Sequence, residues 1–170
     1  MKSIIVILAL FMSITAFACP MDDAEVAKKS TNTSTSSVTV KNGNSPVFLS
    51  PYFVMHAKLI KDVKPSNKDI KALQASLSKE IKNNKSKEVK KELKKAQKFV
   101  KAMEGKEIKA LRAEFYSLSK VLIPFSKKHK LKGVQAYYCP MAKKTWLQNQ
   151  SNITYNPYMP KKMLHCGSKI

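Results

Sequence analysis

Residues 107–125 read EIKALRAEFYSLSKVLIPF, and they form the clearest structural signal in the chain. The apolar side chains of this stretch recur at steps of three and four residues, which places them along one face of an α-helix. They are Ile108, Leu111, Phe115, Leu118, Leu122 and Phe125. Pro124 is expected to kink this helix or to end its last turn. The pattern therefore predicts an amphipathic helix whose apolar face must be buried against other elements.

Three further segments with helical periodicity precede this one, at residues 50–64, 66–84 and 86–104. Ser50 stands before a proline, as is typical of a helix start, and Ser66 begins a capping-box pattern. Gly105 supplies a stop for the third segment. Four amphipathic helices with short polar connections predict an all-α fold, an antiparallel up-and-down four-helix bundle with an irregular C-terminal tail.

The first 18 residues have the features of a secretory signal peptide. Lys2 provides the positive start, residues 4–14 are apolar, and residues 16–18 form an A-x-A cleavage site. No apolar run reaches the roughly 20 residues that a transmembrane helix needs, so we expect no membrane span after cleavage. The protein is expected to be periplasmic or secreted. Acylation of Cys19, the first residue after the cleavage site, is the alternative and would make the protein lipid-anchored.

Residues 19–45 are polar, poor in bulky apolar groups and unable to build a core, so we expect a flexible tether. Residues 46–170 then form the helical bundle, and residues 133–170 form a C-terminal module rich in Cys and Met. The predicted organisation is a signal peptide, a tether and one domain.

The chain is strongly basic, with 32 Lys and Arg against 11 Asp and Glu and a formal net charge of +21. The electric field of a protein with this net charge attracts polyanions. Export separates the protein from nucleic acid, so we expect an anionic envelope surface or an acidic protein as partner instead. Alternatively, the lysines only solvate helix faces, and the spacing of Glu88 and Glu92 to Lys91 and Lys95 predicts ordinary pairs within one helix.

Sulfur is concentrated in the C-terminal module, where helical periodicity is lost. Cys139 and Met141 are two residues apart and share a face of an extended segment, while Met163 and Cys166 share a face of a helical turn. Thiolates and thioethers are soft ligands that favour Cu(I), or Ag(I), over hard cations. Zn(II) is less favoured because only Cys139, His165 and Cys166 are of its usual ligand types here.

The spacing alone does not decide between a metal site and a disulfide. A bond from Cys139 to Cys166 would staple the module to itself, and the methionines would then fill its core. The three cysteines of the chain leave at least one thiol outside simple intramolecular pairing.

The module resembles the periplasmic copper-binding domain of unknown function, which occurs alone and at the C-terminus of Cus-type heavy-metal efflux membrane fusion proteins. The resemblance rests on Cys-Pro-Met-Ala at residues 139–142, Trp146-Leu147, Asn-Pro-Tyr at residues 156–158, and Met-Leu-x-Cys-Gly at residues 163–167. Tyr52-Phe53 and the Arg112, Phe115, Leu118 and Ser119 spacing are consistent with the family's helices but less specific. The chain departs from the family pattern at Met159-Pro160, where an aromatic-glycine pair is common.

The resemblance implies that Cys139, Met141, Met163 and Cys166 bind the metal, and that Trp146 and the Asn-Pro-Tyr turn shape the pocket. It also implies a heavy-metal efflux membrane fusion protein as a partner. Accessory ligand candidates are Met159, His165, Cys19 and Met21. Met55 and His56 are expected to pack in the bundle or lie on its surface.

The sequence therefore predicts a non-enzymatic periplasmic protein that binds Cu(I) or Ag(I) for sequestration or for transfer to an efflux system. We find no catalytic constellation in the sequence. One alternative is an envelope structural or interaction protein with a disulfide-stapled tail and a basic surface. Another is a thiol redox protein, although the chain has no C-x-x-C motif.

Overall fold

The computed structural model describes residues 45–170. The expected signal peptide, nearly all of the tether, and Cys19 and Met21 lie outside the described residues. The described chain runs η1 (Val47–Leu49), α1 (Ser50–Leu59), α2 (Asn67–Asn83), α3 (Lys87–Lys101), α4 (Ile108–Lys128), β1 (Val134–Cys139), β2 (Lys144–Asn149), α5 (Pro160–Met163) and β3 (Ser168–Lys169). None of the helices in this part of the chain combines the length and the apolar character needed to cross a bilayer.

Helices α2 and α3 begin where local capping signals predict, whereas Ser50 does not cap α1, whose N-cap is Leu49 with no side-chain hydrogen bond. The Ser66 side chain accepts a hydrogen bond from the Asp69 amide, and the Asp69 carboxylate accepts one from the Ser66 amide, so the capping box of α2 is complete. Ser86 caps α3 in the same way, by accepting from the Val89 amide at 3.3 Å. Each cap satisfies an amide that has no partner within its helix.

Two helix ends differ from the sequence prediction. Helix α1 ends at Leu59, earlier than the expected stop before Pro65, and a turn follows in which Asp62 has a φ of +57°. Helix α4 continues past Pro124 to Lys128, so of the two effects expected of this proline, a kink or an end, the end does not occur. The Pro124 ring is exposed.

The prediction of an all-α fold is wrong for the C-terminal module. Residues 134–169 contain a three-stranded antiparallel sheet in the order β2-β1-β3, so the protein is mostly helical but has a sheet where an irregular tail was expected. Strands β1 and β2 form a hairpin in which Cys139 pairs with Lys144. Segments of six residues rich in aromatic side chains suit a pleated, half-buried surface and are too short to show helical periodicity.

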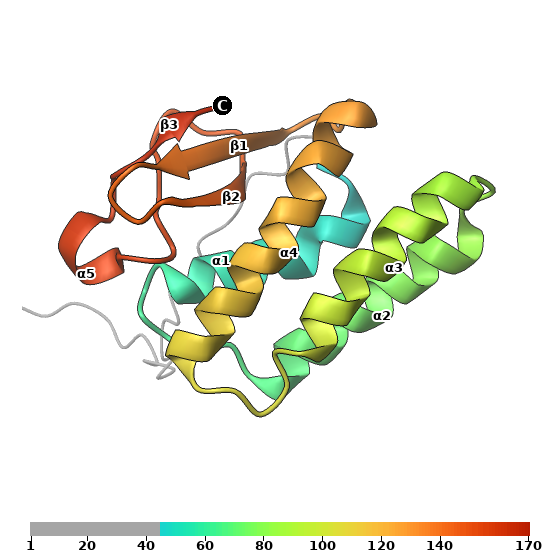
Figure 1. The fold of residues 1–170 in the computed structure, drawn as a ribbon, viewed down its shortest axis with the longest axis horizontal. Coiled ribbons are helices and arrows are strands. Elements are labelled where there is room, and N and C mark those ends of the chain that lie inside the picture. The colour runs from blue at the N-terminus through green and yellow to red at the C-terminus, as the bar shows by residue number, and fades with distance from the viewer. Residues whose placement is uncertain (1–44) are drawn as a thin grey trace, which may run out of the picture. The chain divides into compact units, whose positions relative to one another are not determined.

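Consecutive helices pack against one another, and the sheet packs against α4 through β2. Figure 1 shows α2 and α3 on one side of α4 and the sheet on the other. The core is continuous between the two parts, because buried side chains of the helices and of the sheet belong to one cluster.

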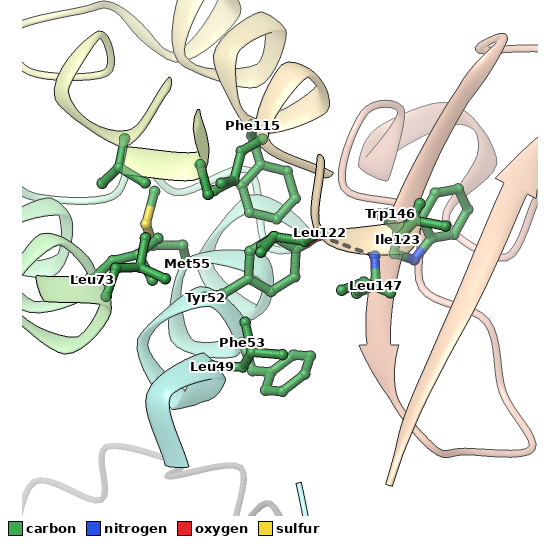
Figure 2. Close-up of a cluster of buried hydrophobic side chains, with 14 of the residues drawn as sticks. Leu49, Tyr52, Phe53, Met55, Leu73, Phe115, Leu122, Ile123, Trp146 and Leu147 are labelled. Carbon is green, nitrogen blue, oxygen red and sulfur yellow. Dashed lines mark hydrogen bonds between the residues drawn. The ribbon is translucent and has the colours of Figure 1, made fainter. Parts of the chain in front are cut away.

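A buried tyrosine connects the helices to the sheet. The Tyr52 ring of α1 stacks on Phe115 of α4, with ring centroids 4.6 Å apart. Its hydroxyl accepts a hydrogen bond from the Leu147 amide of β2 at 3.0 Å and lies 2.8 Å from the Ser119 hydroxyl of α4. Figure 2 shows the Tyr52 hydroxyl directed at Leu147, with Phe115 beside the ring. Because these groups are fully enclosed, the hydrogen bonds fix where the sheet sits on the helices.

Candidate functional site

Strand pairing brings the two cysteine segments together. Strand β1 is the central strand and ends at Cys139, while β3 begins two residues after Cys166. Tyr138 pairs with Ser168, so the antiparallel register, continued by one residue, sets Cys139 opposite Gly167. Two segments that are distant in sequence therefore meet at one end of the sheet.

The side chains of Cys139 and Cys166 lie close enough for one thiol to affect the other. Cys139 is fully buried and Cys166 is half-buried, and both are free cysteines. The hydrogen bond with the Cys139 side chain is the main cause that raises the pKa of the Cys166 thiol. Burial and the nearby Cys139 charge raise this pKa further, because each disfavours the thiolate. A shared metal ion and a disulfide both require the two sulfur atoms to lie close together, so this proximity is compatible with either.

The hairpin turn between β1 and β2 supplies backbone groups to both sulfur atoms. The Ala142 amide donates a hydrogen bond to the Cys139 sulfur at 3.3 Å. The Met141 backbone also forms a hydrogen bond with the Cys166 thiol, which offsets part of the rise in its pKa. Amide donors directed at sulfur stabilise the negative charge of a metal-bound thiolate and orient it. One short turn thus holds both thiols.

The two methionines of the candidate ligand set lie next to this pair in the chain. Met141 is at the hairpin turn and its side chain is 63% exposed. Met163 is the last residue of α5 and is half-buried. The Cys166 amide donates to the Met163 carbonyl at 3.2 Å, and residues three apart in such a tight turn lie on the same side.

His165 and Met159 are the two accessory ligand candidates within the described residues. The His165 ring is exposed, and its Nδ1 donates to the Thr154 carbonyl at 2.9 Å, which leaves Nε2 as the acceptor nitrogen. Met159 precedes α5 and lines a surface hollow together with Asp62 and Arg112. Neither cysteine lines this hollow.

Met55 and His56 are core residues. Met55 has no exposed surface, and the imidazole of His56 forms a 2.9 Å hydrogen bond with the Tyr155 carbonyl. Burial lowers the pKa of His56 to about 4 because the protonated ring would lose its hydration. His56 thus joins α1 to the C-terminal module, whereas Met55 lies beside Leu73 of α2 (Figure 2).

An aromatic cluster supports the sheet beneath the cysteines. Trp146 is fully buried, stacks on Tyr137 with ring centroids 5.8 Å apart, and meets the Tyr158 ring edge-on at 6.0 Å. The Tyr158 hydroxyl donates to the Thr145 carbonyl at 2.7 Å. Gly167 lies against the Trp146 ring, and a Cβ at this position would stand 2.5 Å from its Cη2 atom. The residue after Cys166 therefore has to be glycine for the loop to approach the ring.

Asn156 ties the Asn-Pro-Tyr turn to the Cys166 loop. Its side chain is fully buried, donates from Nδ2 to the Cys166 carbonyl at 3.2 Å, and accepts at Oδ1 from the Tyr158 amide at 2.9 Å. Its own amide donates to the Leu164 carbonyl at 2.6 Å. These bonds hold the loop that carries Cys166 against the turn.

Arg112 connects the same turn to the helices. From α4 it donates to the Pro157 carbonyl at 2.8 Å, to the Leu59 carbonyl at 3.0 Å and to the Asp62 carboxylate at 2.7 Å. The helix residues noted with the family resemblance, Tyr52, Arg112, Phe115 and Ser119, thus lie where the helices meet the module.

Sequence reasoning missed two residues that shape this region. Gln148 of β2 is buried, accepts at Oε1 from the Tyr155 amide at 3.0 Å, and donates from Nε2 to the Ile153 carbonyl at 2.7 Å. Gly167 was noted only as part of a motif. The available signal for a hairpin was a pair of short segments with aromatic residues, 134–139 and 144–149, on either side of a turn that contains Pro140.

Within residues 45–170, no three His, Cys, Asp or Glu side chains gather as a candidate metal site. No family model, curated protein or solved structure matches this chain.

Proposed function

We propose that the protein binds Cu(I), or Ag(I), through Cys139 and Cys166, with Met141 and Met163 completing the ligand set. The observation that carries this proposal is the strand register, which brings the Cys139 and Cys166 segments together at the end of the sheet so that one thiol affects the other. In the proposed role the protein is periplasmic, is not an enzyme, and sequesters the metal or passes it to an efflux membrane fusion protein.

The chemistry of the donor set favours a soft monovalent metal. Two thiolates supply most of the ligands that Cu(I) needs, because this ion prefers sulfur ligands and low coordination numbers. The exposed side chain of Met141 lies two residues after Cys139 in the chain and is free to change its rotamer, because it is not packed in the core. Backbone amides from the hairpin turn would remain directed at both sulfur atoms when the thiols are deprotonated by metal binding.

The partly open position of the pair suits transfer of metal. Cys139 is enclosed, whereas Cys166 is half-buried and Met141 is largely exposed. An incoming ligand from a partner protein can therefore reach the metal from the side of Met141 and Cys166. A thioether binds without losing a proton, so it exchanges more readily than a thiolate.

Anaerobic titration of the reduced protein with Cu(I), in competition with a chromophoric chelator, tests the proposal. Cys139→Ser and Cys166→Ser should each lower the affinity by more than the roughly 10- to 100-fold that loss of an outer-shell partner costs. Met141→Leu and Met163→Leu should cause smaller losses, while Met159→Leu serves as the matched control and should cause none. Unchanged affinity in both cysteine variants would refute the site.

The same proximity of Cys139 and Cys166 favours a second candidate function, that of an envelope structural or interaction protein with a disulfide-stapled module. In that case Cys139 and Cys166 would be oxidised in protein taken from its compartment. Thiol counting after rapid alkylation, with and without prior reduction, separates the two candidates. A Cys19→Ser variant removes the third thiol and makes the count unambiguous.

A further inference from the structure

Helix α3 carries opposite stripes of apolar and basic side chains. Its buried residues recur at steps of four and three, and so do five of its six exposed lysines. The buried stripe is Val89, Leu93, Ala96 and Val100, and the exposed stripe is Lys87, Lys91, Lys94, Lys98 and Lys101. At 1.5 Å per residue this basic face is roughly 20 Å long. We call these five lysines the α3 lysine stripe.

The carboxylates of α3 do not neutralise this stripe. Glu88 and Glu92 were expected to pair with lysines of their own helix, but both bind the Lys128 ammonium of α4, and Glu92 also lies 3.0 Å from the His129 ring. In the described part of the chain, no lysine of α2 or α3 forms an ion pair. The folded arrangement therefore leaves the full charge of the α3 lysine stripe facing solvent.

We propose that the α3 lysine stripe docks the protein onto the surface of an anionic phospholipid bilayer. A row of lysines on a regular helix presents point charges along a line, which complements a diffuse and laterally mobile negative surface. The proposal is independent of metal binding, because α3 and the sheet lie on opposite sides of α4 (Figure 1).

The chemistry of the stripe favours lipid headgroups over nucleic acid. Lysine lacks the planar fork with which arginine binds phosphate or guanine in two places, and the single arginine of the chain, Arg112, is engaged within the fold. Phe99, the aromatic residue of α3, packs against the core and does not stand among the exposed lysines as a stacking platform.

Vesicle co-sedimentation of the full chain tests the proposal. Vesicles of phosphatidylcholine with about a third phosphatidylglycerol should bind the protein, whereas pure phosphatidylcholine should not, and binding should fall steeply as salt is raised. Each lysine near such a surface contributes about a fivefold gain in partitioning. The triple variant Lys91→Gln, Lys94→Gln, Lys98→Gln should therefore bind roughly 100-fold more weakly.

A matched triple variant separates the stripe from net charge. Lys61→Gln, Lys109→Gln and Lys132→Gln remove the same charge from exposed positions outside α2 and α3, and should weaken binding by less than about fivefold. Circular dichroism confirms that both variants are folded, and Cu(I) affinity should be equal in both.

Three results would overturn the proposal. The first is no binding to anionic vesicles at low salt, and the second is an equal loss of binding in the two triple variants. The third is tighter, stripe-dependent binding to single-stranded DNA or to an acidic peptide at matched charge concentration, which would assign the stripe to that partner instead.

Discussion

Replacing Gly167 by alanine should destabilise the protein by about 2 to 6 kcal/mol, because two separate costs fall on this residue. The first is conformational: its φ of +152° lies in a region that L side chains rarely adopt, at a cost of roughly 1 to 3 kcal/mol. The second is steric. A Cβ would stand 2.5 Å from Cη2 and 3.2 Å from Cζ2 of Trp146, well inside the roughly 3.5 to 4.0 Å of normal carbon contact.

The Trp146 ring has little room to relieve this overlap. It is fully buried, stacked on Tyr137 and met edge-on by Tyr158. Overpacking of an enclosed side chain costs about 1 to 3 kcal/mol, since neighbouring groups must shift together. The shift would be felt at Cys166, the residue next to the glycine, so the variant should also bind Cu(I) more weakly.

Urea unfolding measures the stability loss, followed by far-UV circular dichroism and by the fluorescence of Trp146, the single tryptophan of the chain. Gly105→Ala is the matched control. Gly105 has a φ of +69°, but a Cβ there would meet nothing within 4 Å, so only the conformational cost of about 1 to 2 kcal/mol applies. Equal losses in the two variants would refute the claim that contact with the Trp146 ring requires a glycine.

Three further outcomes follow from buried polar groups. Tyr52→Phe removes the hydroxyl that accepts from the Leu147 amide, and should lower the free energy of unfolding by about 1 to 3 kcal/mol in the same urea assay. Asn156→Ala should cost a similar amount and should also raise the rate at which Cys166 is alkylated in reduced protein, because its carbonyl loses the Asn156 donor. The pKa of His56 is about 4 in the folded protein and near 6.5 in the unfolded chain. As the pH falls, the unfolded chain is therefore protonated before the folded protein, and this favours unfolding. Stability should fall by about 3 kcal/mol as the pH drops from 6.5 to 4, and His56→Gln should flatten this part of the profile in urea unfolding at stepped pH.

The helices could be predicted from the sequence because their signals are local. The Ser66 capping box and the Ser86 cap act over three residues, and the apolar stripes specify which face is buried. Prediction was poorer where a distant residue intervenes. Asp62, just after α1, forms ion pairs with Arg112 and with Lys161, which lie far from it in the sequence. No local pattern predicts those partners.

The sheet was missed for the same reason. Strand β1 gains its hydrogen bonds from β2 and β3, and β3 is only two residues long, so it has no periodicity of its own. The sequence did indicate that the final segment is not helical and that it carries most of the cysteine. It did not show that this segment folds as a sheet packed on α4.

By itself, the sequence determined four amphipathic helices, a basic composition and a C-terminal concentration of sulfur, because periodicity, capping and composition act over a few neighbouring residues. Only the tertiary structure decided that the Cys139 and Cys166 segments meet, that Gly167 lies against Trp146, and that the α3 lysines lose their carboxylate partners to Lys128. These outcomes depend on the register between strands and on which helix faces meet. Both are set by burying the whole apolar surface at once, which no short stretch of sequence can specify.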